Sequence, residues 1–543
     1  MSRNVAELVV DALIENGIEQ LYCLPGVQND DFFDALYDRQ DVLPPIHTRH
    51  EQGAAYMALG AALATGKPQA FCVVPGPGFL NSCAALATAY ALNAPVFALI
   101  GQIPSAAVGK GFGLLHEIPD QFGVLRGLTK HAVTIANGDE APGLVREAFL
   151  ALRSGRPRPV GLEVPANVWR MPVNAGADAL SVAAPPPPAV DTNKIEEAGR
   201  LLSTAKRPMI VVGSGAQDHS SDVTRLAEML SAPVLSFRTG HGVMSSDHDL
   251  AARGPVGHDL WRTCDAVVGI GTRLQTQTMQ WGVDDDLSII HIDIDDAELG
   301  RIHEPTVAVH ADVHEALPAL IAAVEGNETH RQEWRAVVRD TKARFEKIYR
   351  ERLAPQLDWL TAIREALPEE GIFVDELTQV GYVSRFALPV YRPRTFLSTG
   401  YQGTLGWGFA AALGAAHARR DVPVVSISGD GGALYAIGEL ATAVRHGIPL
   451  TLVIFNDNAF GNVRRFQIEN YNNRAIASDL ASPDFVKLAE SFGVEGMRVQ
   501  TPDQLRHHLA HAIETSTPTV IEVPVGEFPS PWDFVLMPKV RGQ

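Results

Sequence analysis

The chain has 543 residues, of which 46% are hydrophobic and 20% charged, a composition typical of a globular protein with more than one domain. Its net charge of -18 argues against a nucleic-acid partner, because the basic footprint that such a partner requires is missing. There is no apolar run long enough to span a membrane, no evident signal peptide and no zinc-type cysteine pair, so we expect a cytoplasmic protein without a membrane partner.

Three blocks of alternating strand and helix patterns follow one another along the chain. The first block, residues 1–175, contains strand candidates at 70–74, 96–100 and 160–164. Residues 176–190 are predicted to be a linker, because small residues and four consecutive prolines cannot build a core.

The second and third blocks repeat this pattern. The second block, residues 191–345, has strand candidates at 208–212, 266–269 and 289–294, and a charged helical stretch at 333–353 leads onward. The third block, residues 355–543, has strand candidates at 371–374, 424–427, 450–455 and 519–523. Apolar strands that alternate with helices are typical of parallel sheets, so we predict an α/β protein of three doubly wound parallel-sheet domains.

A phosphate and metal site is predicted in the third block. The strand at 424–427 leads into Gly429-Asp430-Gly431-Gly432, and a helix is predicted over 434–445. Such a turn presents backbone N–H groups to a phosphate, and its aspartate suits Mg²⁺. The strand at 450–455 ends in Asn456-Asp457, 27 residues after Asp430 (457 − 430), which is the span of a parallel crossover. Each motif alone is a common turn, but the pair places both aspartates at one sheet edge.

The pair resembles the thiamine diphosphate signature, a GDG turn followed by two asparagines. The resemblance implies that the Asp430 and Asp457 side chains and the Ala459 carbonyl ligate Mg²⁺. The family usually has Asn where this chain has Asp457, and the second carboxylate still suits Mg²⁺ or Mn²⁺ but bears on the metal preference. The other residues that the resemblance assigns to the cofactor here are Gly429, Gly431, Gly432, Phe460 and Gly461.

The segment His47-Thr-Arg-His-Glu-Gln-Gly-Ala-Ala55 resembles the RHEQGAA motif of the acetolactate synthase group. By that resemblance Glu51 is the catalytic residue. Its carboxyl group contacts a ring nitrogen of the cofactor's pyrimidine, and the proton shared there promotes loss of the thiazolium C2 proton. The resemblance further implies that Gly403 and Leu405 hold the pyrimidine and that Pro25 and Gly26 contact the cofactor.

Similarity to acetolactate synthase and benzaldehyde lyase extends over nearly the whole chain and implies pyrimidine-binding, central and diphosphate-binding domains in that order. It also points to a substrate pocket, although core packing is the alternative for each aromatic side chain. The candidate pocket residues are Gln28, Phe79, His116, Glu117, Tyr382 and Trp532.

The resemblance implies a carboligase or lyase that acts on a small molecule, a 2-keto acid or a 2-hydroxy ketone. A 2-hydroxyacyl-CoA lyase or an oxalyl-CoA-type decarboxylase is the alternative, and the intact Glu51 and Asp430 oppose a non-catalytic paralogue. FAD, which biosynthetic acetolactate synthases bind, is in doubt, because Gly271-Thr-Arg-Leu-Gln275 replaces their arginine- and aspartate-rich turn. In this family the glutamate and the metal motif meet between subunits, so we expect a homodimer or homotetramer with shared active sites.

The tail after residue 526 contains three prolines and several large apolar residues. A disordered tail would not carry so many apolar side chains. Two interpretations stay open. The tail is either a lid that closes over the site, with Lys539 and Arg541 meeting a substrate carboxylate or phosphate, or a segment that packs along the neighbouring domain.

Overall fold

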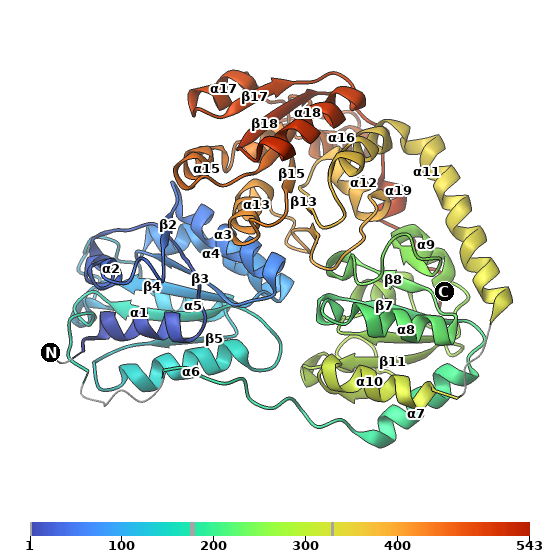
Figure 1. Ribbon diagram of the computed structural model, residues 1–543, viewed down its shortest axis with the longest axis horizontal. Coiled ribbons are helices and arrows are strands. Elements are labelled where there is room, and N and C mark those ends of the chain that lie inside the picture. Colours follow the sequence, from blue (N-terminus) through green and yellow to red (C-terminus); the bar gives the residue numbers. More distant parts are fainter. Residues whose placement is uncertain (1–2, 174–179, 327–330, 543) are drawn as a thin grey trace.

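The computed structural model describes residues 3–173, 180–326 and 331–542, which form three α/β domains (Figure 1). Each domain contains one six-stranded sheet in which all neighbouring strands are parallel, so the predicted fold class is confirmed. No helix in the described part of the chain is long and apolar enough to cross a bilayer.

The N-terminal domain has the strand order β2-β1-β3-β4-β6-β5. Its inner strands are buried along their whole length, because helices cover both faces of the sheet. The strands are β1 (Leu21–Cys23), β2 (Pro45–His47), β3 (Gln69–Val73), β4 (Val96–Gln102), β5 (His131–Thr134) and β6 (Val160–Pro165). The helices are α1 (Val5–Glu15), α2 (Asp30–Tyr37), α3 (Glu51–Thr65), α4 (Pro77–Leu92), α5 (Gln121–Leu128) and α6 (Ala141–Arg153).

The central domain has the strand order β12-β11-β10-β7-β8-β9 and lies opposite the N-terminal domain in Figure 1. Its strands are β7 (Pro208–Val212), β8 (Val234–Ser236), β9 (Ala251–Arg253), β10 (Ala266–Ile270), β11 (Ser288–Asp293) and β12 (Val307–His310). Its helices are α7 (Thr192–Thr204), α8 (Ser220–Leu230), α9 (Gly254–Trp261) and α10 (Val313–Val324), with a π-helical turn at Thr276–Trp281.

The C-terminal domain lies across the other two, and its strand order is β14-β13-β15-β16-β18-β17 (Figure 1). Its strands are β13 (Ile372–Val374), β14 (Phe396–Leu397), β15 (Val424–Gly429), β16 (Thr451–Asn456), β17 (Glu495–Arg498) and β18 (Thr519–Pro524). Its helices are α12 (Gln379–Ala387), α13 (Trp407–Ala418), α14 (Asp430–Ala433), α15 (Leu440–His446), α16 (Gly461–Asn470), α17 (Phe485–Ser491), α18 (Pro502–Thr515) and α19 (Trp532–Val535).

The ten strands predicted from apolar runs are all present, and their ends agree with the prediction to within two residues. The strands that the sequence did not reveal have only two to four residues. Such short segments carry no readable period, and the sheet recruits them through pairing with longer neighbours.

Two predicted helices differ from the structure. The helix expected over 434–445 is interrupted: α14 ends at Ala433, a 3₁₀ turn covers Ile437–Glu439, and α15 begins at Leu440. The helix expected over 333–353 is longer, because α11 (Gln332–Ala366) runs on to the C-terminal domain with a kink at Leu353. Pro355 accounts for the kink, since it removes a helical hydrogen bond and crowds the preceding turn. The expected boundary at 345–355 therefore lies inside one helix.

The predicted linker connects the N-terminal and central domains along the lower side of Figure 1. Residues 180–190 have no regular secondary structure, and residues 176–179 lie outside the described part of the chain. Leu180 and Val182 are buried, and Asn16 bonds the backbone of both, so the beginning of this segment is docked on the N-terminal domain.

The N- and C-terminal domains of one chain pack through helices α3 and α13. Both helices are buried along nearly their whole length and are rich in alanine and glycine. A Cβ on Gly60 would lie 1.8 Å from the Ala411 carbonyl oxygen, and one on Gly414 would lie 1.9 Å from the Met57 carbonyl oxygen. The two backbones are thus in direct contact, which only glycine permits at these positions.

Candidate functional site

Two aspartates lie side by side at the carboxyl ends of β15 and β16. Gly429 and Phe455 are register partners, so the residues that follow them share one sheet edge. Asp430 is 1% exposed and accepts a hydrogen bond from Ser482 Oγ (2.6 Å). Asp457 accepts hydrogen bonds from Gln379 Nε2 (2.8 Å) and from the backbone N–H of Ala459 (3.2 Å).

The charges of this pair fit a divalent cation. Burial, and then the neighbouring Asp430 charge, raises the pKa of Asp457 to about 6. Two carboxylates held this close favour a cation between them, and Mg²⁺ accepts carboxylate and phosphate oxygens. No group of three or more His, Cys, Asp or Glu side chains in the described residues could hold a metal. A metal here would therefore need oxygens from the backbone, water or a ligand.

The turn and loop beside the aspartates leave no space for side chains at two glycines. A Cβ on Gly431 would lie 2.6 Å from Phe460 Cε1, and one on Gly461 would lie 2.5 Å from Asp457 Oδ2. The backbone N–H of Phe460 bonds the Ser478 carbonyl at 2.8 Å, which pins the loop. The Phe460 ring therefore packs directly on the glycine turn.

Two residues that hold the aspartates, Gln379 and Ser482, were not predicted from the sequence as site residues. Gln379 begins α12, just after β13, and β13 pairs with β15. Its side-chain amide oxygen, Oε1, also accepts a hydrogen bond from the Phe528 N–H (3.0 Å), so Gln379 connects the predicted metal motif with the tail. The parallel neighbour of β15 could have pointed to Gln379, because all strands of a parallel sheet end at the same edge.

The predicted pyrimidine-holding segment precedes α13 in the same domain. Gly400, Gly403 and Gly406 all have positive φ values, of +66°, +59° and +79°, so the segment changes direction repeatedly. Leu405 is half-buried within it. The Gly406 N–H at the end of this segment donates a hydrogen bond to the buried carboxylate of Glu376, a residue that was not predicted to belong to the site.

Glu51 begins α3 in the N-terminal domain. Its Oε2 atom accepts a hydrogen bond from Asn81 Nδ2 (2.9 Å), and the imidazole of His50 caps the helix. The Glu439 carboxylate of the C-terminal domain accepts hydrogen bonds from the backbone N–H groups of Arg49 and His50, the latter at 3.0 Å. In the described part of the chain, no hydrogen bond joins the Glu51 side chain to the aspartate pair.

The predicted residues near β1 form a local network. Pro25 is exposed, and a Cβ on Gly26 would meet the Val74 side chain at 2.6 Å. Gln28 is buried, and its side chain contacts His116 Nδ1 (3.0 Å) and the Leu115 carbonyl (3.2 Å). The structure thus brings Gln28 and His116 together across 88 positions of sequence.

Three other pocket candidates have different surroundings. Glu117 accepts hydrogen bonds from the N–H groups of Leu114 and Phe112, and the first of these bonds is the main reason that its pKa is lowered, so its carboxylate braces its own loop. Phe79 is fully buried in the apolar core that the N- and C-terminal domains share, and its assignment to the pocket stays a prediction. Trp532 packs on Tyr382 with ring centroids 4.9 Å apart.

The tail packs along the central domain, which corrects the roles proposed for Lys539 and Arg541. Arg541 is buried, donates hydrogen bonds to the Trp261 and Cys264 carbonyls, and pairs with Asp284. Lys539 Nζ donates to the Gly542 carbonyl. Neither cation faces the aspartate pair, so the packing interpretation holds for the end of the tail.

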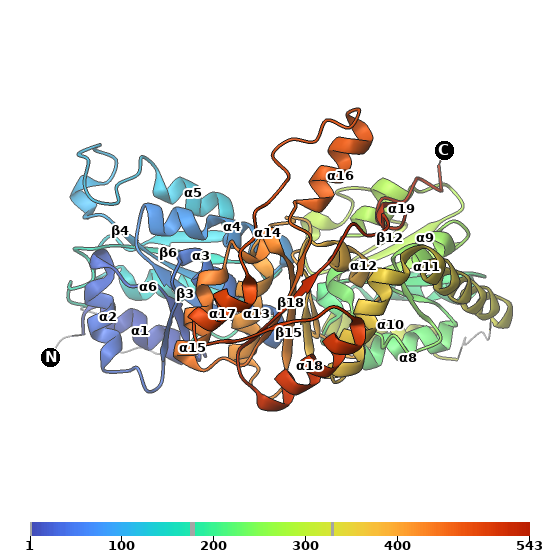
Figure 2. The ribbon, with the colours of Figure 1, turned by 90° about the horizontal axis from the view of Figure 1, so that it is seen from above.

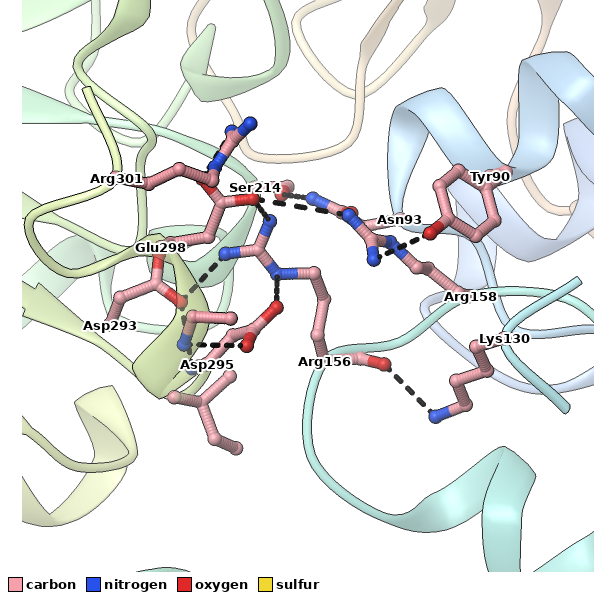
Figure 3. Close-up of polar contacts among 12 residues, drawn as sticks. Tyr90, Asn93, Lys130, Arg156, Arg158, Ser214, Asp293, Asp295, Glu298 and Arg301 are labelled. Atoms are coloured by element: carbon pink, nitrogen blue, oxygen red, sulfur yellow. Dashed lines mark hydrogen bonds and ion pairs between the residues drawn. The ribbon is translucent and has the colours of Figure 1, made fainter.

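A second polar centre lies between the N-terminal and central domains (Figure 3). Arg156 reaches into the central domain, where it pairs with Asp293 (2.9 Å), Asp295 (3.2 Å) and Glu298 (2.7 Å). The turn Gly271–Gln275, on which the doubt about FAD rests, lines an adjacent cavity of about 330 Å³.

The chain matches three domains of thiamine pyrophosphate enzymes in the order in which the structure builds them. The N-terminal TPP binding domain matches residues 3–124, the central domain residues 195–320, and the C-terminal TPP binding domain residues 378–523. The aspartate pair lies within the last match, and Glu51 within the first.

Relatives that align with nearly the whole chain indicate the group within these enzymes. The chain is 33% identical to a "Probable acetolactate synthase large subunit" of Methanocaldococcus jannaschii, over 95% of this chain and 91% of that protein. It is 30% identical to "Acetolactate synthase isozyme 1 large subunit" of Escherichia coli, over 95% and 93%, and 29% identical to "Probable 2-ketoarginine decarboxylase AruI" of Pseudomonas aeruginosa, also over 95% and 93%. The chain belongs to the thiamine-diphosphate-dependent enzymes, in the acetolactate synthase-like group of carboligases and lyases.

Proposed function

We propose that this enzyme makes or breaks a carbon–carbon bond next to a carbonyl in 2-keto acids or 2-hydroxy ketones, as acetolactate synthases do. The observation that carries the proposal is the aspartate pair at the ends of β15 and β16, in a chain that also carries Glu51 at the start of α3. Relatives of similar length that are named acetolactate synthase support the choice of reaction.

In the proposed site, Asp430 and Asp457 would hold Mg²⁺ together with the Ala459 carbonyl, and this metal would neutralise the charge of the cofactor's diphosphate. Gln379 and Ser482 orient the two carboxylates through their hydrogen bonds. Thiamine diphosphate, when bound, supplies a nucleophilic carbon for attack on the substrate carbonyl. The protein's part is to orient that carbon, to exclude water and to move the proton.

Glu51 is the proposed proton-holding group. A carboxyl group that shares a proton with the pyrimidine ring shifts the ring's protonation state and so assists loss of the C2 proton. Asn81 holds the Glu51 carboxylate, and Glu439 fixes the turn before it. These hydrogen bonds fix the position of the Glu51 carboxyl group, which is the group proposed to hold the proton.

The proposed partner is a second copy of the chain. Large apolar side chains are exposed beside both halves of the site: Leu80 next to the Glu51 region is 46% exposed, Tyr435 after the glycine turn 58%, and Ile476 after α16 75%. Helix α16 and the loop after it project from the C-terminal domain in Figure 2. Exposed apolar groups at a functional edge mark an interface. A homodimer or homotetramer would cover them and join Glu51 of one subunit to Asp430 of the other.

Replacement of the proton-holding group tests the proposal. Glu51→Gln should keep thiamine diphosphate and Mg²⁺ bound but slow exchange of the C2 proton by at least about a hundredfold, because a carboxamide cannot share the proton. Exchange is measured by NMR on the bound cofactor after a deuterium pulse. Glu19→Gln, a change at an exposed glutamate paired with Lys67, serves as the control. Near wild-type exchange in Glu51→Gln would remove the assignment.

Decarboxylation is the second candidate reaction, because one relative is named a 2-ketoarginine decarboxylase. Parallel assays with pyruvate, with 2-ketoarginine and with a 2-hydroxyacyl-CoA separate carboligation, simple decarboxylation and acyl-CoA cleavage. Formation of acetolactate from pyruvate as the fastest reaction supports the main proposal. Turnover of the acyl-CoA alone would replace it with the lyase alternative.

A further inference from the structure

Glu376 lies directly after β13, beneath the segment that precedes α13, and is fully buried. One carboxylate oxygen accepts a hydrogen bond from the Gly406 N–H (2.5 Å). The other accepts from the Gly408 N–H (3.3 Å) and from Ser428 Oγ (3.1 Å). One side chain thus connects the end of the glycine-rich segment with the strand that leads into the Gly429–Gly432 turn.

The space around this carboxylate depends on glycines. A Cβ on Gly408 would lie 2.9 Å from Glu376 Oε2, and one on Gly432 would lie 3.1 Å from the carboxyl carbon and Oε1. Both distances are shorter than ordinary van der Waals contact, so glycines on two separate segments leave the space that the Glu376 side chain occupies. The Glu376 side chain is therefore tightly packed between these two segments.

Among the described residues, no cation forms an ion pair with the Glu376 carboxylate. Arg385 pairs with the neighbouring Asp375 (2.7 Å). Burial raises the pKa of Glu376 to about 7, and the hydrogen bonds from Gly406, Ser428 and Gly408 oppose that rise. A charge buried with hydrogen bonds alone is costly for folding, so such groups concentrate at functional sites.

The segment that Glu376 holds has few other constraints. Gly400, Gly403 and Gly406 have positive φ values, and the Thr404 N–H bonds Thr399 Oγ1 at 3.1 Å. Glycine backbone in such conformations is free to move unless side chains fix it. The contact from Glu376 to Gly406 comes directly after Leu405, at the end nearest the start of α13.

We propose that Glu376 is a positioning residue that fixes the Gly403–Gly406 segment, and through it the cofactor's pyrimidine, at a set distance from the diphosphate turn. The inference rests on the proposed function, which assigns the pyrimidine to this segment. Glu376 does not touch the reacting atoms. It sets the spacing between the Gly403–Gly406 segment and the Gly429–Gly432 turn, the two parts of the C-terminal domain that would hold the cofactor.

Inorganic pyrophosphate separates positioning from folding, because it binds only at the diphosphate end. Affinities of cofactor-free protein for thiamine diphosphate and for pyrophosphate are measured by calorimetry with Mg²⁺ at a fixed saturating concentration. In Glu376→Gln the amide cannot accept from all three donors, so thiamine diphosphate should bind about tenfold more weakly while pyrophosphate binding stays unchanged. At saturating cofactor, C2 proton exchange should also slow by about tenfold.

Two further variants keep the result interpretable. Glu376→Asp retains the charge with a shorter reach, and it should raise the ratio of the two dissociation constants in the same direction. Glu298→Gln, a buried carboxyl change in the Arg156 cluster, should lower the melting temperature but leave that ratio at its wild-type value. Equal weakening of both ligands, or no change in either, overturns the positioning role. Failure of the wild-type protein to bind thiamine diphosphate would overturn the proposed function instead.

Discussion

At the residue scale, the second carboxylate of the metal motif is the feature that most distinguishes this site. Asp457 stands where the family usually has asparagine, and it lies against Asp430 in a partly buried setting. Without a cation, the two groups repel each other unless one holds a proton. In the proposed site, with Mg²⁺ and diphosphate bound, the same two carboxylates would be metal ligands.

The first prediction concerns Asp457→Asn in metal-free protein. The pKa of Asp457 is raised from 3.8 to about 6, so its protonated form stabilises the fold at low pH, and that contribution is lost as pH rises through about 6. Asparagine does not ionise, so the Asp457→Asn variant does not lose this stability as the pH rises. In EDTA it should melt about one to three degrees above the wild type at pH 8, and at the same temperature at pH 4. Scanning calorimetry at both pH values measures this, and an equal difference at the two values would contradict it.

The residues of the aspartate pair could be predicted from sequence because each follows an apolar strand in a recognisable turn. Their supports could not. Gln379 reaches Asp457 across 78 positions, and Ser482 reaches Asp430 across 52. Glutamine and serine occur in every loop, and Glu376 would be assigned to the surface by its type. Only the strand order, which places β13 beside β15, brings Gln379 and Glu376 to the site, and a loop before α17 brings Ser482.

At the element scale, the long strands were readable because burial on both faces makes them continuous apolar runs. The helix after the glycine turn was not, because its residues 434–445 have helical composition but its backbone breaks near Ile437–Glu439. The break has a consequence at the site. The last residue of this turn, Glu439, accepts hydrogen bonds from the backbone just before Glu51, in another domain. The contact between Glu439 and the N-terminal domain favours the break in the helix, and helix propensity read from the sequence does not include such contacts.

The second prediction tests the contact between α3 and α13. Gly60→Ala places a methyl group 1.8 Å from the Ala411 carbonyl oxygen, so the helices must separate, which should cost roughly 1–3 kcal/mol or more in unfolding free energy. Gly143→Ala in α6 is the matched control. Its Cβ would meet nothing within 4 Å, and alanine there should stabilise the helix by up to about 1 kcal/mol. Urea denaturation measures both, and equal effects of the two changes would show that the close crossing carries no energetic weight.

At the scale of the whole molecule, the chain joins its three domains by different means. The central domain is attached to the N-terminal domain through Arg156, and to the C-terminal domain through α11 and the tail, where Arg541 is anchored. The sequence could not show whether the tail is a lid or a segment packed on a neighbouring domain, because both arrangements require large apolar side chains that dock on the protein. Phe528 still contacts Gln379, so the tail begins beside the proposed site and ends on the central domain.

The last prediction concerns the sharing of the site between two chains. A dimer mixed from Glu51→Gln and Asp430→Ala chains has one site with both defects and one site with neither. If Glu51 of one subunit works with Asp430 of the other, random exchange of the two inactive variants should restore about a quarter of wild-type activity, because half of the dimers are mixed and each has one intact site of two. Differently tagged subunits separated on two affinity columns show that exchange has occurred. As a control, Glu51→Gln mixed with the double variant Glu51→Gln/Asp430→Ala must stay inactive, since no chain supplies Glu51. If the purified mixed dimer is as inactive as its parents, the site lies within one chain, and the exposed Leu80, Tyr435 and Ile476 need another partner.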